Sequence, residues 1–389
     1  MKLRTLIIII ILVLIVASIG FYFLLHGNGA PNSTGTGQTG SLPSVGNQQI
    51  QNQGANNNAQ GVNNASSSQF GLISNEPILD YFTDSQNRIT VIEPDGIIKT
   101  IANNQPTIIS TTTFTNIAAA SFSYDGKKIL INVSGGTTWQ TNIFDLAKLT
   151  WTKLPAGIQS PAWAPRSYQI AYLRSNPAAG TESVETLNAG VKSPSPVLLT
   201  TIPAEDLTLQ WVNRSMLALA DRPSAYTEGS IWIFDIQNQK LTPLAYESLG
   251  TESIWNTATG TMGLIFTGTS QNAGGNLTLL ANGSQDNLTF GTLPSKCAFD
   301  AAAGSSTLLF CAVPRDQQTF QLARLPDEYD QKVYFTADDF YKINTTDGAL
   351  SIIFSNPNQT LDATNVKIFN NTLFFVNRYD QKLYAISLQ

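Results

Sequence analysis

Short runs of apolar residues separated by polar turns recur along the chain from Phe70 onward. The clearest example is Ser121–Val133, where a run ending in Phe122 is followed by Asp125 and Gly126 and then by a second apolar run. Glycine supplies the positive φ that a tight reversal between antiparallel strands needs. The pattern therefore predicts pairs of short strands joined by turns.

The same unit returns downstream, each time with an aromatic residue at the end of its first run. These aromatic residues are spaced 41, 48, 44 and 44 positions apart. A repeat of that length that carries strands is typical of a β-propeller, in which four-stranded blades surround a channel. The aromatic residues are Phe122, Trp163, Trp211, Trp255 and Phe299.

The number of first strands predicts an all-β, seven-bladed propeller, or six blades if the first repeat is incomplete. The last repeat, residues 365–388, supplies only three strands. Either it stays three-stranded or a segment near 70–74 completes it, which closes the ring and leaves no long edge exposed. The expected first strands lie near residues 71–74, 117–122, 158–163, 207–211, 252–256, 296–299 and 364–369.

The N-terminus contains a long apolar segment. Leu6–Leu25 is twenty residues without a charge, enough to cross a hydrocarbon core of about 30 Å as a helix. Lys2 and Arg4 precede it and the next Lys or Arg is Arg88, which places the N-terminus in the cytoplasm. The alternative is a cleaved signal peptide, but its apolar region would be shorter and no clean Ala-x-Ala site is present. We expect a single-pass protein of the cytoplasmic membrane.

Residues 26–70 predict a flexible linker, because Gly, Asn, Gln, Ser and Thr leave almost nothing apolar to bury. The expected organisation is a cytoplasmic stub at 1–5, a transmembrane helix at 6–25, this linker, and an extracytoplasmic propeller at 71–389. A flexible coil of this length has an end-to-end distance of roughly 35 Å.

Composition narrows the classes of function. Charged residues make up 13% of the chain and the net charge is −5, so there is no electrostatic footprint for nucleic acid. The single histidine, His26, lies outside the predicted propeller, so no Ser-His-Asp set can form there. Two cysteines cannot make a four-thiolate zinc site. We therefore expect no catalytic residue, no metal and no cofactor, and a protein that is not an enzyme.

The two cysteines, Cys297 and Cys311, lie symmetrically about Gly304, the expected turn between adjacent strands. Residues directly opposite in an antiparallel pair can meet the Cα separation that a disulfide needs. An extracytoplasmic compartment permits the bond. We expect a disulfide, with two buried thiols as the alternative, and a structural role in either case.

The sixth repeat is longer than the others and carries an extra segment, residues 313–333, with the one stretch of helical character. Loops on a rigid scaffold often carry function. Asp327, Glu328 and Asp330 around Tyr329 are the candidate residues for binding a cation or a partner. The alternative is a solvated loop packed over one blade.

Four other acidic residues are interpreted as turn formers instead of catalytic acids, because they lie in repeated turns. They are Asp125, Asp145, Asp235 and Asp347. Nothing in the sequence marks a pair of glycosidase carboxylates, although a propeller gathers distant residues at one face.

Two segments, Phe122–Ile129 and Trp163–Tyr172, resemble the repeats of TolB-like propellers, whose consensus is aromatic-Ser-Pro-Asp-Gly, two polar residues and an apolar strand. The match covers residues 116–175 and fades in the other repeats, where the Asp-Gly turn is replaced. The chain is also similar to membrane-anchored bacterial proteins with such an ectodomain. The resemblance implies a protein-binding propeller in the cell envelope and brings no functional residues with it.

We therefore expect a membrane-tethered propeller that acts as a non-enzymatic scaffold or sensor for another envelope protein. The alternative is a carbohydrate-binding or glycoside-hydrolysing propeller. Two carboxylates about 5–10 Å apart beside an exposed Trp at the channel mouth would favour the alternative.

Overall fold

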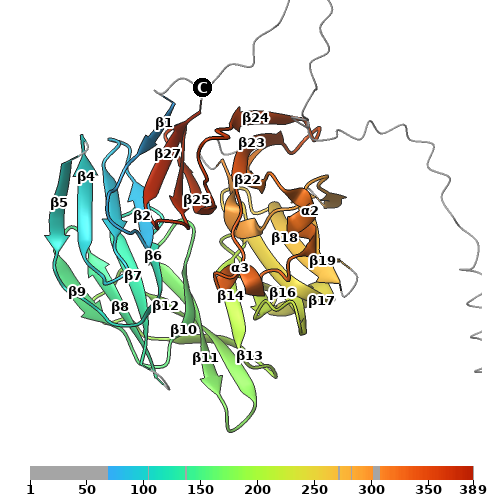
Figure 1. The fold of residues 1–389 in the computed structure, drawn as a ribbon. Coiled ribbons are helices and arrows are strands. Elements are labelled where there is room, and N and C mark those ends of the chain that lie inside the picture. Colours follow the sequence, from blue (N-terminus) through green and yellow to red (C-terminus); the bar gives the residue numbers. More distant parts are fainter. Residues whose placement is uncertain are drawn as a thin grey trace, which may run out of the picture. The chain divides into compact units, whose positions relative to one another are not determined.

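The computed structural model describes residues 69–388, apart from 104, 136–137, 270–271, 282 and 301–306 (Figure 1). The predicted membrane helix at 6–25 and the predicted linker up to residue 68 lie outside the described residues. Within the described part, no helix combines the length and the apolar character needed to span a bilayer.

Antiparallel strands make up nearly all the regular structure of the described residues, which confirms the all-β prediction. In that part of the chain they form six sheets, five of four strands and one of seven. First strands of neighbouring sheets contact one another, for example β2 with β6 and β10 with β14. Four-stranded sheets that follow one another in this way are the blades of a propeller.

The strands of the first three sheets follow the chain order. The first sheet contains β2 (Asp80–Thr83), β3 (Ile89–Ile92), β4 (Ile98–Ala102) and β5 (Gln105–Ser110). The second contains β6 (Ile117–Phe122), β7 (Lys128–Ser134), β8 (Trp139–Asp145) and β9 (Thr150–Lys153). The third contains β10 (Gln159–Trp163), β11 (Gln169–Asn176), β12 (Thr181–Asn188) and β13 (Val197–Ile202).

The remaining sheets include the seven-stranded one. It contains β14 (Leu207–Trp211), β15 (Met216–Asp221), β16 (Glu228–Asp235), β17 (Lys240–Trp255), β18 (Met262–Thr269), β19 (Asn272–Ala281) and β20 (Ser284–Asn287). The next sheet contains β21 (Cys297–Phe299), β22 (Leu308–Pro314), β23 (Asp338–Asn344) and β24 (Leu350–Phe354). The last contains β25 (Ala363–Phe369), β26 (Thr372–Asn377), β27 (Leu383–Ser387) and β1 (Phe70–Leu72).

The long strand β17 joins two groups of strands. Its first part, from Lys240, pairs with β16, and its last part, up to Trp255, pairs with β18. The register with β18 shifts between Leu249 and Glu252. Gly250 between them has φ +63°, a conformation that glycine adopts without strain. The strand therefore changes direction at Gly250, so that its first part belongs to one group of strands and its last part to the next.

The N-terminal strand β1 completes the last sheet by pairing with β27. The Tyr81 hydroxyl of β2 donates a 2.9 Å hydrogen bond to the Phe374 carbonyl of β26, which joins the first sheet to the last. The prediction that a segment near 70–74 completes the last repeat is thus confirmed. The prediction of a first strand at 71–74 is wrong, because that segment pairs at the edge of β27 and β2 is the first strand of its sheet.

The core lies between neighbouring sheets. Second strands supply many of its fully buried residues, such as Leu173 of β11 and Leu219 of β15. Side chains of adjacent sheets pack together; Val91 of β3 shares a cluster with Phe374 and Leu383 of the last sheet. Burial on both faces explains why second strands are continuous apolar runs in the sequence.

Acidic side chains shape the turns between strands. Each of four aspartates accepts a hydrogen bond from the backbone N–H two residues later, at 2.9 to 3.2 Å. The prediction that these residues are turn formers is confirmed. They are Asp125, Asp145, Asp235 and Asp347.

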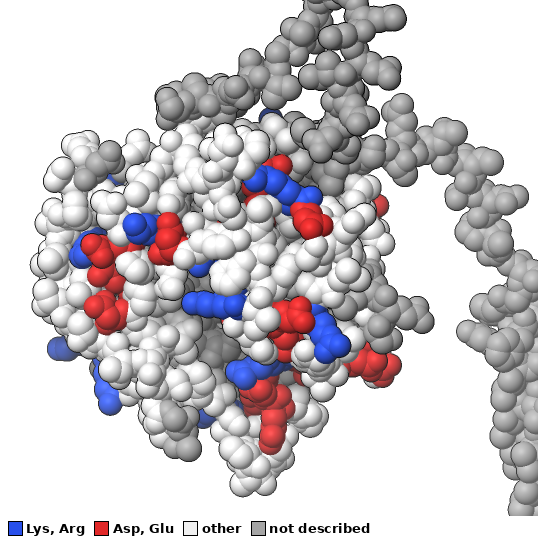
Figure 2. Space-filling model, viewed as in Figure 1, with Lys and Arg blue, Asp and Glu red and all other residues white. Residues whose placement is uncertain are grey.

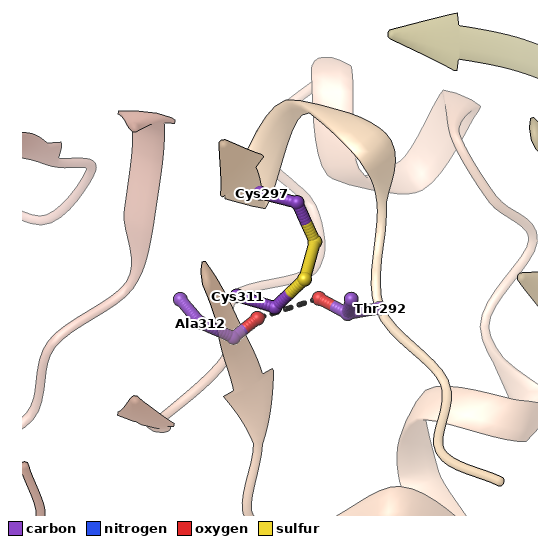
Figure 3. Close-up of a disulfide and its surroundings, with 4 residues drawn as sticks. All are labelled: Thr292, Cys297, Cys311 and Ala312. Carbon is purple, nitrogen blue, oxygen red and sulfur yellow. Dashed lines mark hydrogen bonds between the residues drawn. A yellow bond between two sulfur atoms is a disulfide. The ribbon is translucent and has the colours of Figure 1, made fainter. Parts of the chain in front are cut away.

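The two cysteines lie directly opposite each other on β21 and β22. The sulfurs of Cys297 and Cys311 are bonded at 2.10 Å (Figure 3). Beside the bond, the Thr292 hydroxyl donates a 2.6 Å hydrogen bond to the Ala312 carbonyl (Figure 3). The disulfide therefore ties the first two strands of this sheet within the core.

Candidate functional site

The segment between β22 and β23 folds into two short helices, α2 (Gln317–Leu322) and α3 (Asp327–Asp330) (Figure 1). We call residues 315–333 the insertion. The Asp316 carboxylate accepts a 2.9 Å hydrogen bond from the backbone N–H of Thr319, which caps the start of α2. The expected helical character of this segment is confirmed.

Three large side chains anchor the insertion. Phe320, Leu325 and Tyr329 are at most 3% exposed. They pack in one cluster with Phe266 of β18 and Leu293, which precedes η1 (Pro294–Lys296). Burial of three such side chains anchors the insertion against the sheets, as the alternative of a loop packed over one blade expected, and a role in binding stays a prediction.

Backbone contacts hold the insertion close to the sheets. The Gln317 side chain accepts a hydrogen bond from the Gly291 N–H at 2.7 Å and donates one to the Gly291 carbonyl at 3.1 Å. At Gly250 of β17, an added Cβ would lie 2.5 Å from the Leu325 carbonyl oxygen. Only glycine allows that approach, so the sequence of β17 permits the insertion to cover it.

A buried ion cluster fixes the base of the insertion. The Lys296 ammonium lies 2.6 Å from Asp362 and 2.8 Å from Asp338. Arg378 pairs with the other Asp362 oxygen at 2.7 Å, and its guanidinium lies 3.5 Å from the Tyr329 ring centroid. Burial disfavours both charges, but the opposite charges outweigh it: the pKa of Lys296 is raised and the pKa of Asp362 is lowered. Burial raises the pKa of Asp338, so the ionised pair at the centre of this structural cluster is Lys296 and Asp362.

The four predicted binding residues have different surroundings. The Asp327 carboxylate accepts a hydrogen bond from the backbone N–H of Ala225, and Glu328 accepts one from Arg324 at 3.1 Å. Tyr329 is buried against the ion cluster. Asp330 is exposed at the end of α3. Asp330 alone of the four has an exposed carboxylate without a hydrogen-bond partner among the described residues.

A cavity of about 270 Å³ lies where β14, β17 and η1 meet. A larger hollow of about 510 Å³ lies between the second and third sheets. The smaller cavity differs in that β14 and β17, which are inner strands of the propeller, form part of its wall. Its wall combines polar and apolar side chains. They include Thr208, Gln210, Ser253, Ser295, Ile254 and Pro294.

Glu252 of β17 also lines this cavity. No hydrogen bond or ion pair joins its carboxyl to another residue of the described chain. Burial, together with the negative charge of Asp330, raises the pKa of Glu252 to about 8. Glu252 is therefore mostly protonated at neutral pH and can donate a hydrogen bond into the cavity. In the described residues no group of three or more potential ligands is arranged to hold a metal.

Sequence reasoning missed Glu252. Glu252 lies three positions before Trp255. In the runs that end in Phe122, Trp163 and Trp211, the residue three positions before the aromatic residue is uncharged. This signal is weak, because the first strands β2 and β25 also carry charged residues, Asp80 and Lys367. The proximity of Glu252 to Asp330 depends on the fold of the insertion.

No family model and no curated protein matches the chain. Solved structures do match. An oligogalacturonate lyase in complex with manganese is 10% identical over 84% of this chain and 95% of its own, with a TM-score of 0.57. The oligogalacturonate lyase of Vibrio parahaemolyticus is 7% identical over the same shares, with a TM-score of 0.56. At this identity the likeness shows the fold, a β-propeller.

The predicted resemblance to TolB-like propellers is confirmed at the level of the fold by the propeller structures that match over most of the chain. TolB from Acinetobacter baumannii is among the matches, 19% identical over 56% of this chain and 55% of its own, with a TM-score of 0.40.

The expectation that the protein is not an enzyme is wrong, because structures that share its fold over most of the chain include lyases. The expectation rested on the lack of a Ser-His-Asp set in the sequence. A propeller assembles its sites from inner strands and loops far apart in the chain, as it does for Glu252 and Asp330. The sequence motifs alone therefore give no basis for excluding an activity.

Proposed function

We propose that the protein is a membrane-tethered, seven-bladed propeller that presents the side carrying the insertion to another protein of the cell envelope. The blade count takes the seven-stranded sheet as two blades that share β17. The apolar segment 6–25 is the proposed anchor and residues 26–68 the tether. A tether keeps the propeller near the membrane and raises its effective concentration toward a partner there.

Exposed apolar side chains around the insertion carry this proposal. Leu322 is 81% exposed, Val333 72%, Tyr226 59% and Tyr379 49%. Large apolar side chains that gather at one place in water mark surfaces where proteins associate, and these four lie in the insertion or against residues in or next to it. We call these four residues the insertion surface.

The insertion surface is held in place before any partner arrives. The Arg324 guanidinium lies 5.5 Å from the Tyr226 ring, and Tyr379 stacks on Phe335 with centroids 5.1 Å apart. Buried Phe320 and Tyr329 fix the segments that carry the exposed side chains. A rigid surface loses little conformational entropy on binding, which favours recognition of a folded protein.

The charge distribution supports a protein partner over a polyanion. On the face drawn in Figure 2, acidic and basic side chains lie beside each other and most of the surface carries neither. The chain has 22 Lys and Arg against 27 Asp and Glu. A partner that contributes apolar and aromatic side chains fits such a surface.

Site-specific photo-crosslinking in native membranes tests the proposal. A crosslinker placed at Leu322 or Val333 is expected to capture one envelope protein. The control is Ile108 on β5, an apolar residue that is 57% exposed and belongs to the first sheet, away from the insertion. Equal capture at Ile108, or none at Leu322 and Val333, would refute this choice of surface. Loss of the adduct in Leu322→Arg would support it.

A second candidate function is the recognition of a carbohydrate. Two observations favour it: Glu252 has no hydrogen-bond partner among the described residues in a cavity at the inner strands, and two oligogalacturonate lyases share the fold over 84% of the chain. Calorimetric titration of the protein with neutral and acidic oligosaccharides tests this candidate. It fails if none of them binds.

A further inference from the structure

We propose that the cavity between β14, β17 and η1 binds one ring of a neutral saccharide, and that Glu252 donates a hydrogen bond to one of its oxygens. The proposal rests on the second candidate function. It specifies that function further, because it names the class of ligand, a neutral saccharide, and the residue that selects it, Glu252.

The size and wall of the cavity fit a single sugar ring. At about 270 Å³ it is just below the roughly 300–1,000 Å³ of pockets that hold drug-sized ligands. Hydroxyl groups of Thr208, Ser253 and Ser295 line it together with the apolar Ile254 and Pro294. A sugar ring offers hydroxyls to the first group and a C–H face to the second.

The inner strand and the insertion together place the carboxyl group. Glu252 follows Gly250 and Thr251, and Gly250 packs directly under the Leu325 carbonyl of the insertion. Leu325 and Pro326 at this contact lead directly into α3, whose Asp330 carboxylate acts on Glu252. The Thr251 hydroxyl, on the same stretch, is buried and has no hydrogen-bond partner in the described residues. Free polar groups in and beside the cavity indicate a place where a ligand can supply hydrogen bonds.

Other charged groups near the cavity are already paired. Lys296 of η1 is held by Asp338 and Asp362. Asp221, at the end of β15, accepts a 2.8 Å hydrogen bond from the Ser230 N–H. The exposed pair of Arg222 and Asp206 is separated by 3.6 Å. Burial is thus the main cause of the raised pKa of Glu252, and Asp330 is the charged group that adds to it.

The negative charge of Asp330 selects the kind of ligand. A protonated Glu252 donates a hydrogen bond to a neutral hydroxyl or ring oxygen. A uronate carboxylate near Asp330 would be repelled. An organic cation would also bind two carboxyl groups, but it would favour ionised Glu252. Neutral and cationic ligands therefore have opposite pH dependences, which makes them distinguishable.

The experiment uses the full chain in lipid nanodiscs, which avoid sugar-headed detergents. Binding is measured by calorimetry at pH 6 and pH 9 for the neutral trisaccharides maltotriose, cellotriose and chitotriose, for trigalacturonate, and for spermidine. The variants are Glu252→Gln, Glu252→Ala and the control Glu228→Gln, at an exposed glutamate of β16.

We expect a neutral trisaccharide to bind the unmodified protein at pH 6 and about ten-fold more weakly at pH 9, because a carboxyl with a pKa of about 8 is about nine-tenths ionised there. Glu252→Gln keeps a donor and is expected to bind equally at both pH values. Glu252→Ala is expected to bind at least ten-fold more weakly at pH 6, and Glu228→Gln to behave as the unmodified protein.

Each contrary result has a distinct meaning. Binding of trigalacturonate without any neutral sugar would overturn this proposal and leave the carbohydrate function standing. Spermidine binding that strengthens at pH 9 would identify a cation site and overturn it. No binding of any saccharide to folded protein would overturn both.

Discussion

The Lys296 ammonium lies 2.6 Å from the Asp362 carboxylate, and neither side chain has exposed surface. Lys296 belongs to η1, whereas Asp362 immediately precedes β25 in the last sheet. The cluster also contains Arg378, which follows β26, and Asp338 at the start of β23, so it consists of two basic and two acidic side chains. Charges in a dry interior are stable only when paired and hydrogen-bonded, so the cluster fixes the last two sheets and the insertion in one arrangement.

Removing the charge of Lys296 is expected to destabilise the protein strongly. Lys296→Met leaves two buried carboxylates with one cation, Arg378, between them. Loss of one partner of a buried ion pair costs about 3–5 kcal/mol. Urea denaturation at pH 7 measures the change. Lys127→Met, at a lysine that is 69% exposed, is the control and should change the free energy of unfolding by less than about 0.5 kcal/mol. Similar values for the two variants would show that the cluster contributes little.

The protonation of Glu252 predicts how stability depends on pH. Its folded pKa of about 8 lies above the unfolded value of about 4.3, so between these values the folded state keeps a proton that the unfolded state has lost. The contribution of Glu252 is therefore greatest at low pH. The free energy of unfolding should fall as pH rises from about 4.3 to 8, by at most about 1.4 kcal/mol per unit.

Glu252→Gln isolates this contribution, because glutamine has nearly the same shape and does not titrate. The variant and the unmodified protein should be about equally stable at pH 4, and the variant should be more stable at pH 9. Chemical denaturation at both pH values measures the difference. A constant difference across that range would mean that the Glu252 carboxyl is ionised normally in the folded protein.

The repeated strands were predictable because each depends on its own few residues. The turn at Asp125 and Gly126 and the apolar run after it have the same local cause wherever they occur. The strand at Phe70–Leu72 was harder, since three residues fit either a first strand or an outer one. Its position is decided by pairing with β27, more than 300 residues away.

The candidate site depends on contacts that the sequence does not encode locally. Glu252 and Asp330 are brought together because Gly250 permits the Leu325 carbonyl to approach. The ion cluster around Lys296 likewise needs the last two sheets to be adjacent. A lysine next to a cysteine in the sequence gives no sign that it will be fully buried between two aspartates.

The closing strand is expected to be held largely by Phe70. Its ring stacks on Phe354 and Tyr384, with centroids 4.9 and 5.5 Å apart. Because Phe70 is only partly buried, Phe70→Ala should cost about 2–3 kcal/mol, below the range for a fully buried ring. Leu72→Ala on the same strand is the control and should cost under about 1 kcal/mol, since Leu72 is 41% exposed. Equal losses in thermal denaturation would argue against ring stacking as the main contact.

The disulfide is expected to stabilise the folded protein independently of the proposed binding sites. Cys297 and Cys311 are 14 residues apart and buried, so the bond restricts the unfolded chain. A loop of that size gives roughly 3 kcal/mol in the chain-entropy model. Dithiothreitol should therefore lower the urea midpoint of the unmodified protein and leave that of the double variant Cys297→Ala and Cys311→Ala unchanged. Crosslinking at Leu322 should persist in the double variant at a temperature where it is folded. An unmodified protein whose midpoint does not respond to reductant would show that the bond adds no stability.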